Sequence, residues 1–359
     1  MGLLKAITIP GGRDYSLTGA EADRAVTKGL AHGKWYRTPL DREAMKVLME
    51  RRDGPAMRDT AIWLGLILGS AAGGIWFWGS WWAVPFFFVY GVIYGSSSDS
   101  RWHETLHGTA FKTRWMNKAL YQLASFMMMR NPVVWRRSHA RHHADTIIVG
   151  RDPEITGMRP PQLFIIGLNV IGLVATPLAF GALVRQATGR FSADEDHLIA
   201  EPSRAANAVL AARCHLAIYA ATGAACVWMG SILPAMLIGL PNIYGRWLLL
   251  FYGLPQHLGL AEDVHDHRLN SRTVYFNPVL RFLYWNMNYH MEHHMYPMVP
   301  YHALPALHEA VKHDCPPASP SLWHAWREIV PCVLRQLKDP THFIRPELPP
   351  GAAKPVLGP

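Results

Sequence analysis

The sequence predicts an all-α integral membrane protein with four transmembrane helices in two hairpins, interfacial helices and a cytoplasmic cap rich in histidine. Its 359 residues are 50% hydrophobic and only 17% charged, which is little charge for a soluble protein. Four nearly uncharged runs each approach the ~20 residues that cross a bilayer as a helix. Three groups of histidines lie outside these runs.

The first predicted hairpin joins residues 60–78 to residues 81–97 through an uncharged link, Gly79-Ser80. Tryptophans gather around this link, as they do in the aromatic belts of membrane surfaces, at Trp76, Trp78, Trp81 and Trp82. Residues 1–59 carry many basic groups and are expected to form a cytoplasmic N-terminal segment. Both outer ends of the hairpin therefore face the cytoplasm.

Two further segments complete the predicted membrane domain, which covers residues 60–315. Residues 114–130 mix apolar and basic side chains and predict a helix along the membrane surface. Residues 208–229 and 232–252 predict a second hairpin, again with an uncharged link. Residues 316–359 are expected to hold an amphipathic helix over 322–337 and a proline-rich tail without fixed structure.

The histidine groups point to a metal. The run HETLH spaces two histidines one helical turn apart, and two later runs place three histidines at i, i+3 and i+4. In a helix, this spacing directs the three imidazoles to one face. Crowding buried imidazoles without a metal is costly, because both ring nitrogens of each need a partner. The three groups are His103 and His107; His139, His142 and His143; and His290, His293 and His294.

A shared metal site restricts the topology. Its histidines must lie on one side of the membrane, so an even number of crossings must separate His143 from His290. The apolar segment 163–184, which Gly172 and Pro177 interrupt, would make three crossings if it spanned. We therefore expect this segment to dip into or lie along the cytoplasmic leaflet.

The remaining composition excludes several other classes of protein. The four cysteines form no CxxC pair, which indicates neither a zinc ribbon nor a disulfide framework. There is no glycine-rich phosphate loop and no legible haem or flavin module. The net charge of +9 needs no partner beyond the membrane, since positive-inside bias accounts for it. We expect no nucleic-acid partner.

The pattern HxxxH, HxxHH, HxxHH with four spans closely resembles the membrane fatty acid desaturase and hydroxylase superfamily, over roughly residues 60 to 310. The run QHLGLAEDV before NYHMEHHMYP, closed by PYHALPALHE, resembles the acyl-lipid desaturase branch. The resemblance implies two non-haem irons held by the eight histidines of the three groups, with O2 as co-substrate. Relatives usually add one more histidine before the third group, and we select His257, with His265 and His267 as reserves. Some relatives have an asparagine where this chain has Gly253, so a water ligand on one iron stays an open question.

The expected reaction is O2-dependent oxidation of a fatty acyl chain in the membrane. Two irons with nitrogen ligands form with O2 an oxidant able to attack an unactivated C–H bond. Desaturation is favoured and hydroxylation stays open, because both begin with the same hydrogen abstraction. Two electrons must come from an external ferredoxin-like or cytochrome-like donor, for which Arg136, Arg137 and Arg141 offer either a docking patch or a lipid-facing one. Carboxylates expected to orient the imidazoles are Glu104, Asp145, Asp152, Glu262 and Glu292.

Three other interpretations compete with this one. HETLH is literally the HExxH motif of zinc proteases, but that interpretation leaves both HxxHH groups unexplained. A soluble di-iron carboxylate bundle would need more glutamates than histidines. A metal carrier would be expected to place histidines along the spans, where only His215 lies.

Overall fold

The protein is almost entirely helical. A computed structural model describes residues 12–358, so the first eleven residues of the predicted N-terminal segment lie outside the described part. Within it there are helices and isolated β-bridges but no strand, which confirms the all-α prediction. The described residues form two compact units, with residues 12–51, 136–163 and 251–358 in unit 1 and residues 52–135 and 164–250 in unit 2.

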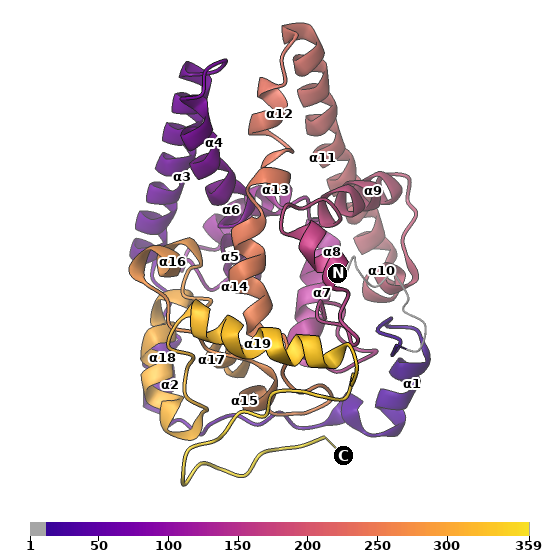
Figure 1. Ribbon diagram of the computed structural model, residues 1–359, viewed down its shortest axis with the longest axis vertical. Coiled ribbons are helices and arrows are strands. Elements are labelled where there is room, and N and C mark those ends of the chain that lie inside the picture. The colour runs from indigo at the N-terminus through magenta and orange to yellow at the C-terminus, as the bar shows by residue number, and fades with distance from the viewer. Residues whose placement is uncertain (1–11, 359) are drawn as a thin grey trace. The chain divides into compact units, whose positions relative to one another are not determined.

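Unit 2 contains the first predicted hairpin. Helices α3 (Asp53–Trp76) and α4 (Ala83–Gly95) run antiparallel and pack along their length (Figure 1). The turn between them contains Gly79 at φ +89°, a conformation that favours glycine. Trp76 and Trp81 at this turn are 82% and 90% exposed. The predicted helical hairpin is confirmed, although α3 begins seven residues before the expected start at 60.

The second hairpin differs from its prediction in one arm. Helix α11 (Pro202–Met229) is continuous, as expected. Residues 232–252 were expected to form one helix, and instead form α12 (Leu233–Leu237), α13 (Pro241–Tyr244) and most of α14 (Trp247–Gly253). Gly239, at φ +98°, lies in the break between α12 and α13. Pro241 begins α13, because a proline ring cannot continue the preceding helix.

The interrupted arm approaches α4 backbone to backbone. A Cβ atom added to Gly245 would lie 1.9 Å from the carbonyl oxygen of Gly91 on α4. Ser96, which caps α4, donates through Oγ to the Gly245 carbonyl at 2.6 Å and accepts from the Leu249 amide at 2.9 Å. The break therefore allows close packing that fixes the end of α4, just before the HETLH segment.

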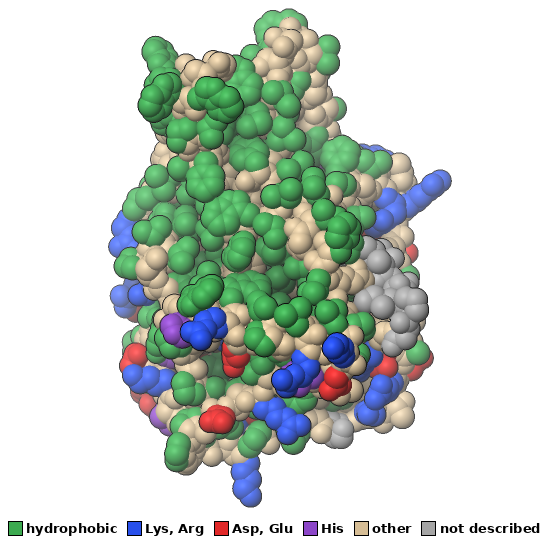
Figure 2. Space-filling view, viewed as in Figure 1, with side chains coloured by type: hydrophobic (Ala, Val, Ile, Leu, Met, Phe, Trp, Pro, Cys, Tyr) green, Lys and Arg blue, Asp and Glu red, His purple; other side chains and the backbone are tan. Residues whose placement is uncertain are grey.

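The apolar surface of unit 2 is consistent with a membrane protein. Two helical stretches, Arg42–Trp76 and Pro202–Met229, are long and apolar enough to cross a bilayer by length and composition. Figure 2 shows a surface of hydrophobic and uncharged groups over α3, α4, α11 and α12. Four transmembrane spans and a cytoplasmic metal site stay predictions.

Residues 163–184 do not form one spanning helix. They form α8 (Leu163–Asn169) and most of α9 (Ala175–Ala187), with Gly172 at φ +64° in the turn between. A Cβ atom on Gly172 would lie 2.3 Å from the carbonyl oxygen of Asn242. Both helices are shorter than the ~20 residues of a span. Their place at the cytoplasmic leaflet stays a prediction.

The three helices that follow α4 carry the first two histidine groups. They are α5 (Ser98–His107), the predicted surface helix α6 (Arg114–Met127), and α7 (Pro132–Ala144). Arg130 between α6 and α7 forms an ion pair with Asp99 of α5 at 2.6 Å, and its guanidinium lies 4.1 Å from the Trp102 ring centroid. These contacts fix α5 against the link between α6 and α7. The short α10 (Ala193–Leu198) also belongs to unit 2.

Unit 1 contains short helices joined by long irregular segments. They are α1 (Ala20–Thr27), α2 (Arg42–Leu48), α15 (His267–Asn270), α16 (Pro278–Leu283), α17 (His290–Met295), α18 (Leu304–Val311) and α19 (Leu322–Gln336). Helix α19 confirms the amphipathic helix predicted over 322–337, and packs Ala325, Ile329 and Val333 into a buried cluster with Leu258 and Val274.

The C-terminal tail packs against the rest of unit 1, so the prediction that it has no fixed structure is wrong. The amide of Ala353 donates to Asp314 at 2.8 Å, and the amide of Val356 donates to Asp266 at 3.1 Å. Both carboxylates are buried and form ion pairs with the fully buried Arg268. Composition alone did not predict this packing, because the acceptors lie far from the tail in the sequence.

Candidate metal centre

Helices α7 and α17 present the two HxxHH groups in the predicted geometry. On α17, His290, His293 and His294 are at most 2% exposed. On α7, His139 and His142 are similarly buried, and His143 is partly so. All six belong to unit 1, and their ring nitrogens gather into two groups.

The first group in unit 1 contains His139, His143 and His293. The Nε2 atom of His143 lies 3.1 Å from that of His139 and 3.2 Å from that of His293. Two helices about 150 residues apart in the sequence thus direct three imidazole nitrogens to one point. A metal ion held between them would replace these close nitrogen contacts by coordination bonds.

The second group contains His142, His257, His290 and His294, whose ligand atoms all lie within 4.8 Å of one another. The Nε2 atom of His290 is 3.0 Å from those of both His257 and His294. His257 therefore lies among the histidines of the second and third sequence groups, and it stays the predicted extra ligand.

The two reserve histidines lie outside both groups. His265 hydrogen-bonds through Nε2 to the Leu30 carbonyl at 2.9 Å. His267 stacks on Trp35 with 4.2 Å between the ring centroids. Gly253, the position of an asparagine in some relatives, ends α14 and offers no side-chain donor.

His103 and His107 lie in unit 2, on α5. Their ring centroids are 5.5 Å apart, as the one-turn spacing predicts. Glu104 between them is fully buried on the same helix.

The chemistry of the two unit 1 groups fits a transition metal. Burial lowers the pKa of His257 to about 3 and holds the pKa values of His290, His293 and His294 well below the usual range. These imidazoles are therefore neutral near pH 7 and have a nitrogen lone pair to share. Clustered neutral imidazoles suit iron, zinc or copper rather than magnesium or calcium, which prefer oxygen.

Hydrogen bonds at Nδ1 leave Nε2 for the metal in four of the histidines. His142 donates to Asp152 at 2.8 Å, and His139 donates to Glu154 at 3.0 Å. His257 donates to the Asn270 carbonyl at 2.7 Å, and Nδ1 of His294 lies 3.1 Å from the Thr146 hydroxyl. Such partners fix the tautomer and the orientation of a ligating imidazole.

Asp152 is built to stay ionised. Burial alone would raise its pKa, but His142 and the amides of Ile147 and Glu154 outweigh burial and lower the pKa. Asp152 was predicted from the sequence as an orienting carboxylate, whereas Glu154 was not. The available signal was its position two residues beyond Asp152, within the same loop after the second histidine group.

Three other predicted orienting carboxylates have different partners. Asp145 forms ion pairs with Arg141 and Arg151, and Glu262 binds Arg13 and Tyr15. Glu292 hydrogen-bonds His308 at 2.6 Å, although it stands between the histidines of the third group in the sequence. In a helix, Glu292 points away from the face of His290, His293 and His294, which explains the difference.

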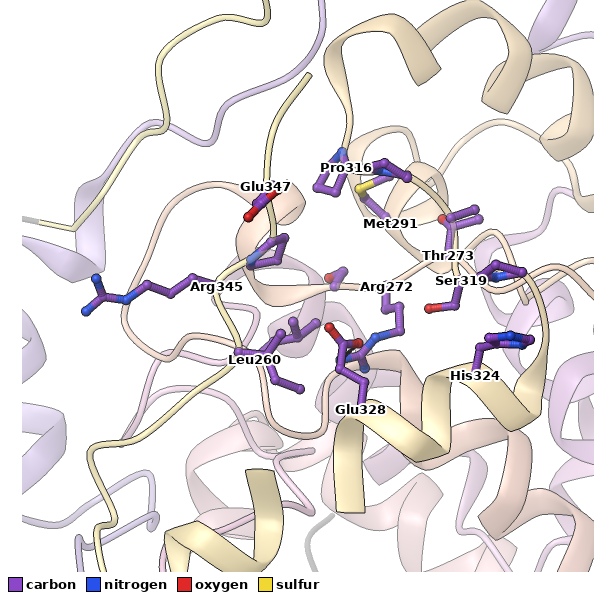
Figure 3. A pocket seen from close by; sticks show the side chains of 16 residues that line it. Leu260, Arg272, Thr273, Met291, Pro316, Ser319, His324, Glu328, Arg345 and Glu347 are labelled. Carbon is purple, nitrogen blue, oxygen red and sulfur yellow. Dashed lines mark hydrogen bonds and ion pairs between the residues drawn. The ribbon is translucent and has the colours of Figure 1, made fainter. Parts of the chain in front are cut away.

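A pocket of about 510 Å³ lies beside α17 in unit 1, where Met291 forms part of its wall (Figure 3). Charged groups line it at Arg272, Glu328, Arg345 and Glu347. None of the predicted ligands is among its lining residues. A pocket with this charge does not suit an acyl chain, since burying a charge against hydrocarbon is costly.

Comparison with known proteins agrees with the geometry. The family model described as fatty acid desaturase matches residues 79–326, which is more than half of the chain and contains all three histidine groups. No curated protein matches the chain. The match confirms the resemblance predicted from the histidine spacing, and the chain belongs to the fatty acid desaturase family.

Proposed function

We propose that this protein is a di-iron oxidoreductase that uses O2 and two external electrons to desaturate a fatty acyl chain in the membrane. The observation that carries the proposal is the convergence of mostly buried imidazoles from α7, His257 and α17 into two groups of ring nitrogens. Membership of the desaturase family supports the lipid substrate and the oxidative chemistry.

The proposed ligands are the nine histidines selected from the sequence. His142, His257, His290 and His294 hold one iron, and His139, His143 and His293 hold the other. We assign His103 and His107 to the same centre, as the family resemblance implies. The bound irons supply, with O2, the oxidising power to break a C–H bond.

The residues of the chain position and protect this chemistry. Asp152 and Glu154 hold the imidazoles in one tautomer through Nδ1. Burial keeps His257 and the three histidines of α17 neutral by lowering their pKa values, and it excludes water, which limits loss of oxidising equivalents to solvent. In the balanced reaction, a –CH2–CH2– unit, O2, two electrons and two protons give –CH=CH– and two waters.

Hydroxylation is the second candidate, because the same ligand set supports it. There, one C–H bond, O2, two electrons and two protons give an alcohol and one water. Zinc-dependent proteolysis through HETLH is a remote third candidate. It would give no role to the two imidazole groups of unit 1.

Mass spectrometry of lipids distinguishes these candidates. The chain is expressed in cells with a competent reductase, beside His293→Ala and a control, His324→Ala, whose histidine is exposed on α19. We expect acyl chains that have lost two hydrogens with the wild type and the control, and none with His293→Ala. Products that have gained an oxygen atom would favour hydroxylation. The absence of any new lipid from the well-expressed, iron-loaded wild type would contradict the proposal.

A further inference from the structure

Three aromatic rings lead from a half-buried position in unit 1 to a proposed iron ligand. Trp35 and His267 are stacked, with 4.2 Å between ring centroids and 5° between planes. His267 in turn lies 5.1 Å from His294, with 34° between the rings. Trp35 is partly exposed, whereas His267 and His294 are each 2% exposed.

The position of Trp35 is fixed from several sides. Its Nε1 donates to the Ala144 carbonyl at the end of α7, at 2.9 Å, and its edge contacts His265. The next residue, Tyr36, donates its amide to the His265 carbonyl at 2.8 Å. The ring also packs against a buried cluster that includes Leu30 and Ile148. The Trp35 ring is therefore held in one position, where it contacts both solvent and His267.

The proposed function requires a route for electrons through the protein. The histidine groups are buried, so a protein donor cannot contact the metals directly. Packed aromatic rings offer a short, continuous path between such a donor and the metal. If the rings served only to pack the core, Trp35 would not need to reach the surface, and the stack would not need to end at the proposed ligand His294.

We propose that an acidic one-electron carrier protein docks over Trp35 and delivers electrons through His267 to the iron held by His294. This inference rests on the proposed function. In each step the carrier is oxidised by one electron and the bound iron is reduced by one. The electron tunnels through the stacked rings, so neither ring is itself oxidised and no bond is made or broken there.

The charge around Trp35 indicates the kind of partner. Lys34 and Arg37 on either side are exposed, and exposed Lys28 ends α1, which packs near Trp35. Exposed Lys354 also belongs to this region. Arg268 donates to the Lys354 carbonyl, and the Arg268 guanidinium lies 3.8 Å from the ring centroid of Tyr36, the residue after Trp35. A basic surface around a partly exposed aromatic ring suits an acidic redox protein. Arg141, one of the three arginines predicted for this role, is instead paired with Asp145.

The test separates electron delivery from metal binding. Purified full-length, iron-loaded protein is reduced in a stopped-flow instrument, either by reduced plant-type ferredoxin or by dithionite. We expect Trp35→Leu and His267→Leu to slow reduction by ferredoxin at least about tenfold. Reduction by dithionite should not change, because a small reductant needs no docking site. Trp323→Leu, at a 69% exposed tryptophan on α19, is the matched control and should behave as wild type.

A conservative substitution guards against loss of structure. His267→Phe keeps a flat ring in the stack but cannot bind metal. We expect it to keep its iron and to transfer electrons within about threefold of the wild-type rate. Loss of iron from His267→Phe would show that His267 is a ligand and overturn the proposed route.

Binding of oxidised ferredoxin tests the docking surface without turnover. Lys34→Glu with Arg37→Glu should weaken binding at least about fivefold at low salt, and the difference should shrink at high salt. The control pair Arg335→Glu with Lys338→Glu lies on exposed positions at and beyond the end of α19 and should have no effect.

The outcomes distinguish the two proposals. A wild-type chain that holds no iron contradicts the proposed function. If both reagents reduce the wild-type chain and Trp35→Leu is reduced as fast as the wild type, only the proposed electron route is contradicted. Reduction by dithionite but not by ferredoxin overturns the choice of partner.

Discussion

Asp152 and Glu154 act on the candidate centre through single hydrogen bonds. Each carboxylate accepts from the Nδ1 atom of one buried histidine, His142 or His139. The bond fixes which nitrogen carries the proton and therefore which nitrogen faces the metal. An uncharged residue at either position would leave the imidazole free to adopt the other tautomer or to rotate.

We therefore expect Asp152→Ala and Glu154→Ala each to weaken iron binding by about 10- to 100-fold. The measurement is iron retained during titration with a chelator. Asp339→Ala, at an exposed carboxylate, is the control and should retain iron as the wild type does. Equal retention by all three variants would mean that these carboxylates do not orient ligands.

At this scale, the helical period explains which site residues could be predicted. The i, i+3, i+4 spacing alone is enough to place His290, His293 and His294 on one helix face, and α17 has this arrangement. Glu154 and Trp35 do not belong to any such helical repeat of histidines. Trp35 bonds to a carbonyl 109 residues away, and contacts between distant segments depend on how the loops fold. The spacing of residues along the chain therefore could not predict their roles.

The element that most shapes unit 2 is the interrupted arm formed by α12, α13 and most of α14. Hydropathy predicted an apolar segment over 232–252 correctly but not its break, because periodicity cannot detect two backbones in contact. Gly91 and Gly245 meet where a side chain would not fit. The same contact fixes the end of α4, which leads into α5 and its two histidines.

We expect Gly245→Ala to destabilise the protein by about 1–3 kcal/mol, because the added methyl group would clash with the Gly91 carbonyl. Thermal unfolding in detergent measures the change. Gly223→Ala on α11 is the control: nothing lies within 4 Å of its added Cβ atom, and alanine favours a helix. A Gly245→Ala protein as stable as Gly223→Ala would contradict the close approach of the two backbones.

On the scale of the whole molecule, unit 1 depends on segments from both ends of the chain. Arg268 pairs with Asp266 and Asp314, and the tail supplies amides to both carboxylates. The sequence predicted the histidine-rich composition of this unit. It did not predict the role of the tail, since a proline-rich segment has no pattern that identifies its acceptors.

Truncation after Gly351 should lower the free energy of unfolding by about 1–3 kcal/mol, because buried carboxylates lose hydrogen-bond donors. Thermal unfolding is again the measurement. Truncation after Leu357 keeps the Ala353 and Val356 amides and serves as the control. If both truncations unfold at the same temperature, the tail contributes nothing through these bonds.

The division of the unit 1 histidines into two groups makes a prediction about metal content. We expect about two irons per chain in the wild type. His290→Ala affects only the second group and His293→Ala only the first, so each should first lose one iron and retain the other. Metal analysis by mass spectrometry measures the ratio, with His324→Ala as the control.

Because ligands stabilise the state that binds them, iron loading should also raise the unfolding temperature, by less in either variant than in the wild type. One zinc per chain, unchanged by His293→Ala, would contradict the di-iron assignment and favour the HETLH site.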